Sequence, residues 1–265
     1  LLAPFTYSHT ALALFLAMHI LTGMVGITFS YHRQLTHRAF ATPKIIEYAA
    51  SWIGCLALQG DPIEWVSAHR HHHKECDTEA DPHSPYDGFF WSHMGWMYDE
   101  LGTPTLRDTS NAADLWRQKW YVFLRKTYPL HPAAVAVAFY VWGGLPFLVW
   151  GVALRTVSMW HTTWLVNSAS HVWGFQSWKT NDLSMNNWWV GLLAFGEGWH
   201  NNHHAFEDSA RHGLEWWQVD VTWYLIATLR FLGLAKQVRL PSERKMKALK
   251  VDEEKIVPVS WTGAK

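Results

Sequence analysis

Two long stretches of the chain carry no charged side chain, and they constrain the fold more than any other feature. Residues 11–30 contain His19 as their only strongly polar side chain, and residues 133–154 are uncharged throughout. A helix needs about 20 apolar residues to cross the hydrocarbon core of a bilayer. Helices also satisfy their own backbone hydrogen bonds there. The two stretches therefore predict an all-α integral membrane protein.

A third uncharged stretch, residues 156–175, follows directly and is more polar. It predicts a return helix, joined to the second stretch by a tight hairpin at Arg155. The pair Gly143-Gly144 and Pro146 predict a kink in the outgoing helix. Residues 1–5 would end an earlier membrane helix, and a chain that starts with Leu is expected to begin inside a longer product. We therefore expect up to four spans, the first of them truncated.

The charges divide the chain in the same way. Of 22 Lys and Arg residues, Arg155 alone falls in the predicted hairpin, and the others lie in 31–131 or after 175. The positive-inside rule places those two regions on one cytoplasm-like face. Residues 45–58 are apolar but short, which predicts a helix in or on the membrane surface, with a buried core helix as the equal alternative. Residues 236–265 form a basic, mixed-charge tail that we expect at the surface.

Composition excludes several other classes. Asp plus Glu also number 22, so no net charge field favours nucleic acid. Cys55 and Cys76 are the only cysteines, too few for a disulfide framework or a cysteine-based zinc site. Without an internal repeat, residues 1–265 are expected to form a single domain.

Histidine is clustered in four places. In a helix, positions i, i+3 and i+4 share a face, so the histidines of each His-x-x-His-His motif are expected to point the same way. The Asn-Ser-Ala-Ser-His motif places its first and last residues one turn apart. The first cluster has a spacing of five, which one straight helix would not align, so we expect one ligand at a helix end and one beyond it. The candidate ligands are His32, His37, His69, His72, His73, Asn167, His171, His200, His203 and His204.

Nine imidazoles and one amide are too many for one zinc ion, which takes four ligands, and they suit two metal ions. Imidazole binds Fe, Zn, Cu and Ni, so ligand type leaves the metal open. A carboxylate-bridged di-iron bundle uses two Glu-x-x-His motifs, and this chain has only one, from Glu197 to His200, which argues against that class. The remaining histidines are interpreted as ordinary core or surface groups: His9, His19, His71, His83, His93, His131, His161 and His212.

These motifs resemble the membrane fatty acid desaturases, specifically the stearoyl-CoA-type Δ9 branch. The three boxes HxxxxH, HxxHH and HxxHH are present, and the sequence NSASH is similar to that branch's NSAxH. The similarity continues through the pairs Gly60-Asp61, Glu64-Trp65, Gly95-Trp96 and Thr163-Trp164, and through Asp81-Pro82-His83. Residues 196–220 look most like plant and algal members, including the plastid palmitoyl-galactolipid Δ7 desaturases.

The resemblance implies a fold and a chemistry. Membrane helix hairpins would lie under a helical cap in which the nine histidines hold two Fe²⁺ ions, with Asn167 acting through a water. Gln59, Trp65, Thr163 and Trp164 match positions that shape a bent acyl tunnel. The implied reaction inserts a cis double bond at the expense of O2, with no bound organic cofactor. Because the chain has no flavin, haem or iron–sulfur motif, two electrons must come from a partner, ferredoxin in a plastid or cytochrome b5 in the endoplasmic reticulum.

Finer substrate expectations rest on single positions. Met24 lies about two turns before His32, and its length would shorten the tunnel, which favours a C16 chain. Animal acyl-CoA relatives carry a basic pair where residues 97–100 read Met-Tyr-Asp-Glu, and a basic residue where this chain has Ser67. Carboxylates repel CoA phosphates. We therefore expect Δ7 or Δ9 desaturation of a chloroplast galactolipid.

Four alternatives remain open. The first is an acyl-CoA Δ9 desaturase of the endoplasmic reticulum membrane. A lipid hydroxylase or acetylenase would share the metal chemistry. A non-catalytic desaturase-fold subunit of a membrane complex would keep the fold for lipid or pigment contact. A haem-binding span has only His19 and His161 as poorly placed ligands.

Overall fold

The computed structural model describes residues 2–98, 108–251 and 259–260, and these ranges are almost entirely helical. The prediction of a helical fold is therefore confirmed. The α-helices are α1 (His9–Ile20), α2 (Lys44–Cys55), α3 (Pro62–Glu75), α4 (Phe89–His93), α6 (Ala113–Trp116), α7 (Lys119–Thr127), α8 (Leu130–Leu148), α9 (Arg155–Asn167), α10 (Ala169–Val172), α11 (Trp188–Leu193), α12 (His200–Ala205), α13 (Val221–Phe231) and α14 (Glu243–Leu249).

Short 3₁₀ turns and two π-helical stretches join these helices, and one pair of two-residue strands is antiparallel. They are η1 (Ala3–Thr6), η2 (π, Leu21–Thr36), η3 (Pro85–Asp87), η4 (Gly95–Tyr98), η5 (Ser110–Ala112), η6 (π, Val149–Leu154), β1 (Trp173–Gly174) and β2 (Val259–Ser260).

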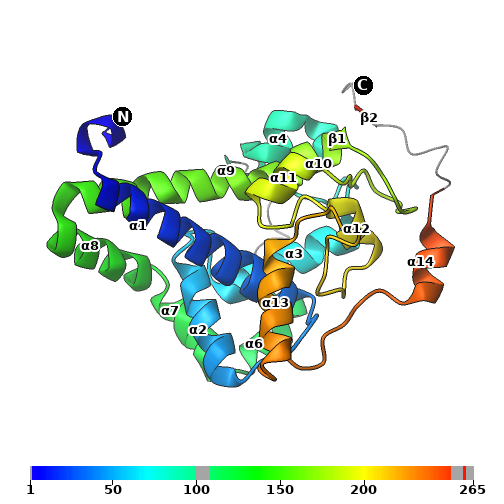
Figure 1. Cartoon of the computed structure of the whole chain (residues 1–265), viewed down its shortest axis with the longest axis horizontal. Coiled ribbons are helices and arrows are strands. Elements are labelled where there is room, and N and C mark those ends of the chain that lie inside the picture. Colours follow the sequence, from blue (N-terminus) through cyan, green and yellow to red (C-terminus); the bar gives the residue numbers. More distant parts are fainter. Residues whose placement is uncertain (1, 99–107, 252–258, 261–265) are drawn as a thin grey trace.

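The first long helix joins α1 to η2 without a break (Figure 1). It begins where the Ser8 hydroxyl accepts a hydrogen bond from the Ala11 amide, a normal helix N-cap. It runs 28 residues from His9 to Thr36, and its most apolar 18-residue window has a mean hydropathy of 2.0, so it is long and apolar enough to cross a membrane. The predicted span 11–30 lies inside it.

The second apolar region turns earlier than the sequence analysis predicted. Gly144 has φ 63° and ψ −153°, a backbone conformation that breaks the helix inside α8, four residues before its end at Leu148. Pro146 follows and is well placed in a first helical turn, where its missing N–H is not needed. Figure 1 shows α8 and α9 folded back on each other at this end of the molecule. The hairpin expected at Arg155 is wrong, because Arg155 is buried within the continuous helix of η6 and α9.

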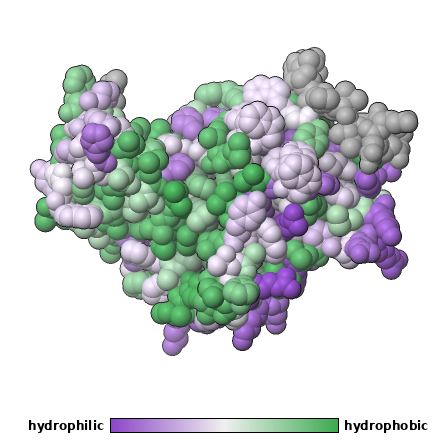
Figure 2. Space-filling model, in the orientation of Figure 1, coloured by the Kyte–Doolittle hydropathy of each residue, from purple (hydrophilic) through white to green (hydrophobic). Residues whose placement is uncertain are grey.

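These helices expose apolar surface. Only 11% of the most apolar window in Leu130–Val172 is buried. Figure 2 shows hydrophobic residues gathered over the half of the molecule that contains α1 and α8, with hydrophilic residues over α14. A large exposed apolar surface is typical of a lipid-facing one.

The short apolar stretch 45–58 forms most of α2, which packs against η2. A Cβ on Gly26 would lie 2.8 Å from the Gly54 Cα, so the two backbones approach closely. One face of α2, including Ala50 and Cys55, is buried, while Ile45 on the outside is 78% exposed. One face of the helix therefore lies in the core and the other is exposed, and its place at a membrane surface stays a prediction.

The remaining helices form a cap at the end of the first long helix (Figure 1). Ile63 and Val66 of α3 join Tyr31 and Leu35 of η2 in one buried cluster. On α14, Met246 and Leu249 pack against a second cluster, which contains Trp178, Ala205 and Phe206. The described part of the basic tail is mostly exposed, as expected, and residues 252–258 and 261–265 lie outside the described ranges.

Candidate metal centre

All nine histidines of the four motifs lie together, in two groups. Within each group, the ring nitrogens that could bind a metal lie within 4.8 Å of one another. The five-histidine cluster consists of His32, His37, His69, His73 and His203. The four-histidine cluster consists of His72, His171, His200 and His204.

Each His-x-x-His-His motif is divided between the two clusters. On α3, His69 and His73 face the five-histidine cluster and His72 faces the other; on α12, His203 is separated from its two partners in the same way. The expectation that each motif points in one direction is therefore too simple. Successive residues in a helix are rotated by about 100°, so neighbours in a His-His pair can serve two centres that lie side by side.

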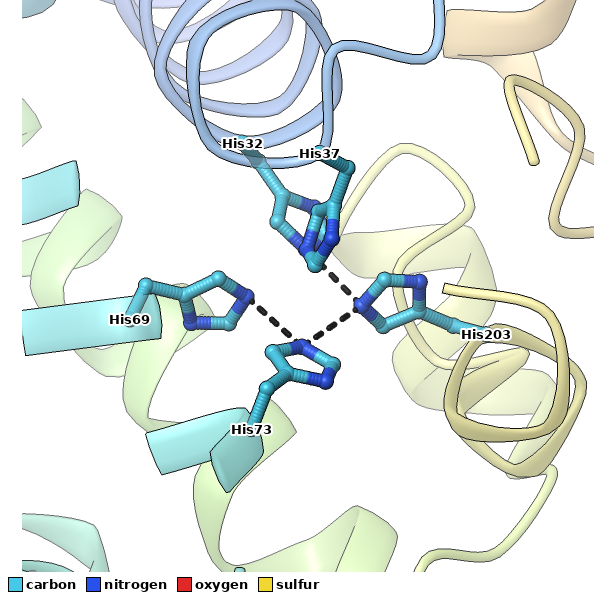
Figure 3. Close-up of side chains that lie close together, drawn as sticks. All are labelled: His32, His37, His69, His73 and His203. Atoms are coloured by element: carbon cyan, nitrogen blue, oxygen red, sulfur yellow. Dashed lines mark hydrogen bonds between the residues drawn. The ribbon is translucent and has the colours of Figure 1, made fainter. Parts of the chain in front are cut away.

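The spacing of five in the first motif is explained by the π-helix. The His37 amide donates to the His32 carbonyl over 3.2 Å, an i to i+5 hydrogen bond at the end of η2. This wider turn brings both side chains to one side, whereas an α-helix would separate them. Figure 3 shows these two rings pointing at the centre from one segment, with His69 and His73 from α3 and His203 from α12.

The ring nitrogens approach as metal ligands do. The Nε2 atom of His203 lies 3.0 Å from Nε2 of both His32 and His73, and His171 and His200 make the same 3.0 Å contact in the other cluster. The Nε2 atoms of His37 and His204 are buried without a hydrogen-bond partner in the described part of the chain. Lone pairs that converge in this way fit a cation at the centre of each cluster.

Carboxylates contact the Nδ1 atom of four of the cluster histidines, on the side of the ring opposite Nε2, the candidate metal ligand. The contacts to Nδ1 are 2.7 Å from Glu197 to His32, 3.0 Å from Asp81 to His72, 3.1 Å from Asp77 to His171 and 3.0 Å from Asp182 to His204. Such a carboxylate fixes the tautomer that carries its hydrogen on Nδ1 and leaves Nε2 free for a metal. The histidine motifs by themselves predict no role for these acids. The only signal was their position, since Asp77 and Asp81 closely follow the second box and Glu197 precedes the third by three residues.

A buried ion network ties Glu197 to the first helix. Arg33 is fully buried and donates to Glu197 Oε1 and to both oxygens of Asp220. Burial alone would raise the pKa of Glu197, but Arg33 and His32 beside it hold that pKa well below its usual range. Glu197 is therefore a carboxylate that can accept the hydrogen bond from His32.

Burial also sets the charge of the imidazoles. It lowers the pKa of His69, His73, His200 and His203 well below 6.5, and neighbouring histidines lower it further. The neutral form, which is the metal-binding form, is thus favoured at neutral pH.

A cavity of about 440 Å³ reaches the five-histidine cluster at His69. Four predicted substrate residues, Gln59, Trp65, Thr163 and Trp164, line it together with Asn167. A hydrogen-bonded chain runs along this wall: Trp65 Nε1 donates to Gln59 Oε1 over 3.2 Å, and Gln59 Nε2 donates to Thr163 Oγ1 over 2.8 Å.

A smaller space of about 50 Å³ shares Trp65, His69, Thr163 and Asn167 with the first cavity and extends to Met159 and Phe195. The two spaces are therefore neighbours beside the metal centre.

Other predicted positions are placed differently. Met24 lines neither of these two cavities, whereas Thr28, one turn later, lines the smaller one. The tunnel-shortening role of Met24 thus has no support from the cavity geometry. Ser67 is buried and donates to the Asp108 carbonyl, so its hydroxyl does not face the cavity. Asp99 and Glu100 lie outside the described residues.

Among the histidines interpreted as ordinary groups, His71 hydrogen bonds to the Ala80 carbonyl and belongs to neither cluster. His93 pairs with His161 over 3.0 Å. Two others, His83 and His212, are buried against the clusters.

Comparison with known proteins agrees with this geometry. A family model described as fatty acid desaturase matches residues 9–234. The chloroplastic palmitoyl-monogalactosyldiacylglycerol delta-7 desaturase of Arabidopsis thaliana is 59% identical over 245 residues, covering 92% of this chain and 66% of that protein. Acyl-CoA 5-desaturase AL21 of Anemone leveillei is 53% identical over 247 residues, covering 91% and 75%. Delta-9 acyl-lipid desaturase 1 of Arabidopsis thaliana is 50% identical over 245 residues, covering 92% and 80%. The chain spans about two thirds of the first relative's length.

Proposed function

Because this chain belongs to the fatty acid desaturase family, we propose that it inserts a cis double bond into a lipid-linked acyl chain, using two iron ions and O2. The carrying observation is that the 440 Å³ cavity reaches the five-histidine cluster at His69, while the smaller space beside it reaches His200 of the four-histidine cluster. An oxidising centre and a space for an apolar chain are both needed, because an alkyl C–H bond has no acidic proton.

Iron bound to these histidines would supply the oxidation, in which two electrons from the acyl chain and two from an external donor reduce O2 to water. The residues of the chain do the positioning. His69 lies at the boundary between cavity and cluster, and Asn167 faces both cavities. The carboxylates behind the rings keep the ligand nitrogens aimed at the centre.

The cavity wall orients the substrate. The hydrogen bonds among Trp65, Gln59 and Thr163 fix these side chains where the larger cavity lies beside the smaller one. A rigid wall holds one pair of methylenes beside the centre, which selects the double-bond position. Asn167 is proposed to hold a metal-bound water, in agreement with its place on both cavities.

For the head group we propose a galactolipid with a C16 chain, desaturated at Δ7 or Δ9. Of the described residues that line the larger cavity, Glu64 alone carries a formal charge, and no Lys or Arg lines it. A site with a carboxylate and no cation disfavours the phosphates of CoA and suits uncharged hydroxyl groups. The delta-7 relative supports the same choice by its name. Acyl-CoA remains the alternative, since another relative is named for it.

The location and donor follow from that choice. A galactolipid substrate places the protein in a chloroplast membrane, and chloroplastic relatives support this location. The electron donor there would be ferredoxin. An acyl-CoA substrate would instead imply the endoplasmic reticulum membrane and cytochrome b5.

Lipid profiling of a host that makes galactolipids tests the proposal. Cells expressing the full-length protein should gain monounsaturated C16 chains on galactolipid, with the double bond located by mass spectrometry. A His203→Ala variant should give none, and a His131→Ala variant should match the wild type. No new unsaturation at equal protein level would refute the catalytic role and favour a non-catalytic subunit.

The same lipid profile distinguishes the alternative functions from one another. New unsaturation confined to the acyl-CoA pool and its products would refute the galactolipid choice alone. A product heavier by one oxygen would indicate a hydroxylase. Loss of four hydrogens would indicate an acetylenase.

A further inference from the structure

Two histidines outside the ligand motifs lie directly behind the clusters. His212 is 1% exposed and His83 is 9% exposed, and each packs against a cluster histidine. The ring centroids of His212 and His203 are 4.4 Å apart with an interplanar angle of 29°, and those of His83 and His72 are 4.3 Å apart. One such histidine therefore accompanies each cluster.

Both share a carboxylate with a cluster histidine. His212 Nδ1 lies 3.2 Å from Glu197 Oε2, and the same oxygen lies 2.7 Å from His32 Nδ1. In the other cluster, the two oxygens of Asp81 lie 3.0 Å from His72 Nδ1 and 3.4 Å from His83 Nδ1. The arrangement histidine–carboxylate–histidine thus occurs twice, once behind each cluster.

The backbone fixes His212 in this position. Its amide donates to Asp220 Oδ2 over 2.8 Å, and its carbonyl accepts from Asn202 Nδ2 over 2.7 Å. Asp220 is itself held by Arg33, which also holds Glu197 Oε1. Glu197 therefore has Arg33 on one oxygen and two imidazoles on the other, so its orientation depends on all three neighbours.

We propose that His212 is a positioning residue for the five-histidine cluster, and that His83 does the same for the four-histidine cluster. His212 Nδ1 contacts the carboxylate that orients His32 at 3.2 Å, and its ring packs against the ring of His203. His83 acts on His72 through Asp81. Neither residue is proposed to bind the metal or to take part in the chemistry. The inference rests on the proposed function in one respect, that the clusters hold metal.

Loss of His212 has two local effects. Glu197 Oε2 keeps only one imidazole contact, so His32 is less firmly oriented, and a gap opens beside His203. Changes behind a ligand typically weaken metal binding by about 10- to 100-fold. Because His212 contacts only the five-histidine cluster, the other metal should be retained.

Two substitutions separate positioning from simple packing. His212→Asn places an amide nitrogen near the position of Nδ1 and keeps a polar contact to Glu197, whereas His212→Leu fills similar space without a donor. The matched pair for the other cluster is His83→Asn and His83→Leu. His131→Leu is the control, since His131 contacts Trp52 and Thr127, far in sequence from either cluster.

The experiment measures iron per chain, iron affinity against a competing chelator, and Mössbauer spectra of the ⁵⁷Fe-loaded full-length protein. His212→Leu should lose one iron site about 10-fold more readily than wild type, and His212→Asn should restore most of the affinity. The His83 pair should affect the spectrum of the other site. Two irons bound by His212→Leu with wild-type affinity, or equal losses in the Leu and Asn variants, would overturn the inference while the proposed function stands. A wild-type protein that binds no iron would overturn both.

Discussion

The Nε2 atoms of His32 and His203 lie 3.0 Å apart although 171 residues separate them in sequence. One belongs to the end of the first long helix and the other to the short helix α12, so metal bound between them would join two distant parts of the chain. A ligand that binds only the folded state stabilises it by about 2.7 kcal/mol at 100 times its dissociation constant.

Metal removal should therefore destabilise the protein. Chelation is expected to lower the Tm of the detergent-solubilised protein by roughly 5–10 °C. Hydrogen exchange should rise most in α3 and α12, which supply His73 and His203. Readdition of Fe²⁺ should reverse both effects, and an unchanged Tm on complete metal removal would contradict the prediction.

Adjacent histidines should control different metals. His72 and His73 belong to different clusters. His72→Ala and His73→Ala are each expected to retain about one iron per chain, with different Mössbauer signals, while the double variant retains neither. His71→Ala, in the same box but in neither cluster, is the matched control. The same residual spectrum in both single variants would show that the two clusters are not separate sites.

The cavity wall should control regiochemistry. Thr163→Val keeps the shape of the side chain and removes the acceptor for Gln59 Nε2. A lost hydrogen bond of roughly 1 kcal/mol predicts about a fivefold fall in kcat/KM, together with new double-bond isomers from a less fixed chain. Thr127→Val removes a hydroxyl that bonds to the Phe123 carbonyl and to His131 and that lines neither of the two cavities, so it should change neither quantity. A single unchanged isomer at full activity would exclude this role for Thr163.

Chain-length preference should respond to Gly23 and not to Met24. A Cβ at Gly23 would meet Met159 Sδ at 2.5 Å and Phe195 Cε2 at 2.6 Å, and both side chains line the smaller cavity. Gly23→Ala is therefore expected to push them into that space and shift the preference to shorter chains. Met24→Ala, on the same helix, is the control and should leave product lengths unchanged. A shift with Met24→Ala alone would restore the original expectation.

Iron should be retained in mildly acidic solution. A proton and a metal ion compete for the same imidazole lone pair, and burial lowers the pKa of His69, His73, His200 and His203. At a given pH these rings therefore bind fewer protons than an exposed imidazole with a pKa of 6.5. Iron in the five-histidine cluster, which contains His69, His73 and His203, should stay constant after equilibration as the pH falls through 6.5 and drop only at lower pH. Half-loss at or above pH 6.5 would be inconsistent with this burial.

Much of the fold can be predicted from local patterns in the sequence. The run 11–30 predicted the first long helix because hydropathy and length are properties of one segment. The turn predicted at Arg155 lies instead at Gly144 within α8, because the Gly144 backbone breaks the helix whereas Arg155 is part of a continuous one. A charged residue can be buried within a helix, whereas a helix cannot continue through φ 63° and ψ −153°.

The sequence by itself determined the family, the residue types of the metal centre and the nine histidines that supply it, since spacing and motif are local. Only the tertiary structure decided how these nine histidines divide between the two clusters. His72 and His73 separate because α3 lies between two centres, and His32 and His37 align because a π-helix widens the turn. Three carboxylates acquire their roles from contacts with histidines far along the chain. Glu197 contacts His32 across 165 residues, Asp77 contacts His171 across 94, and Asp182 contacts His204 across 22. Such contacts depend on how helices pack against one another, which no local spacing specifies.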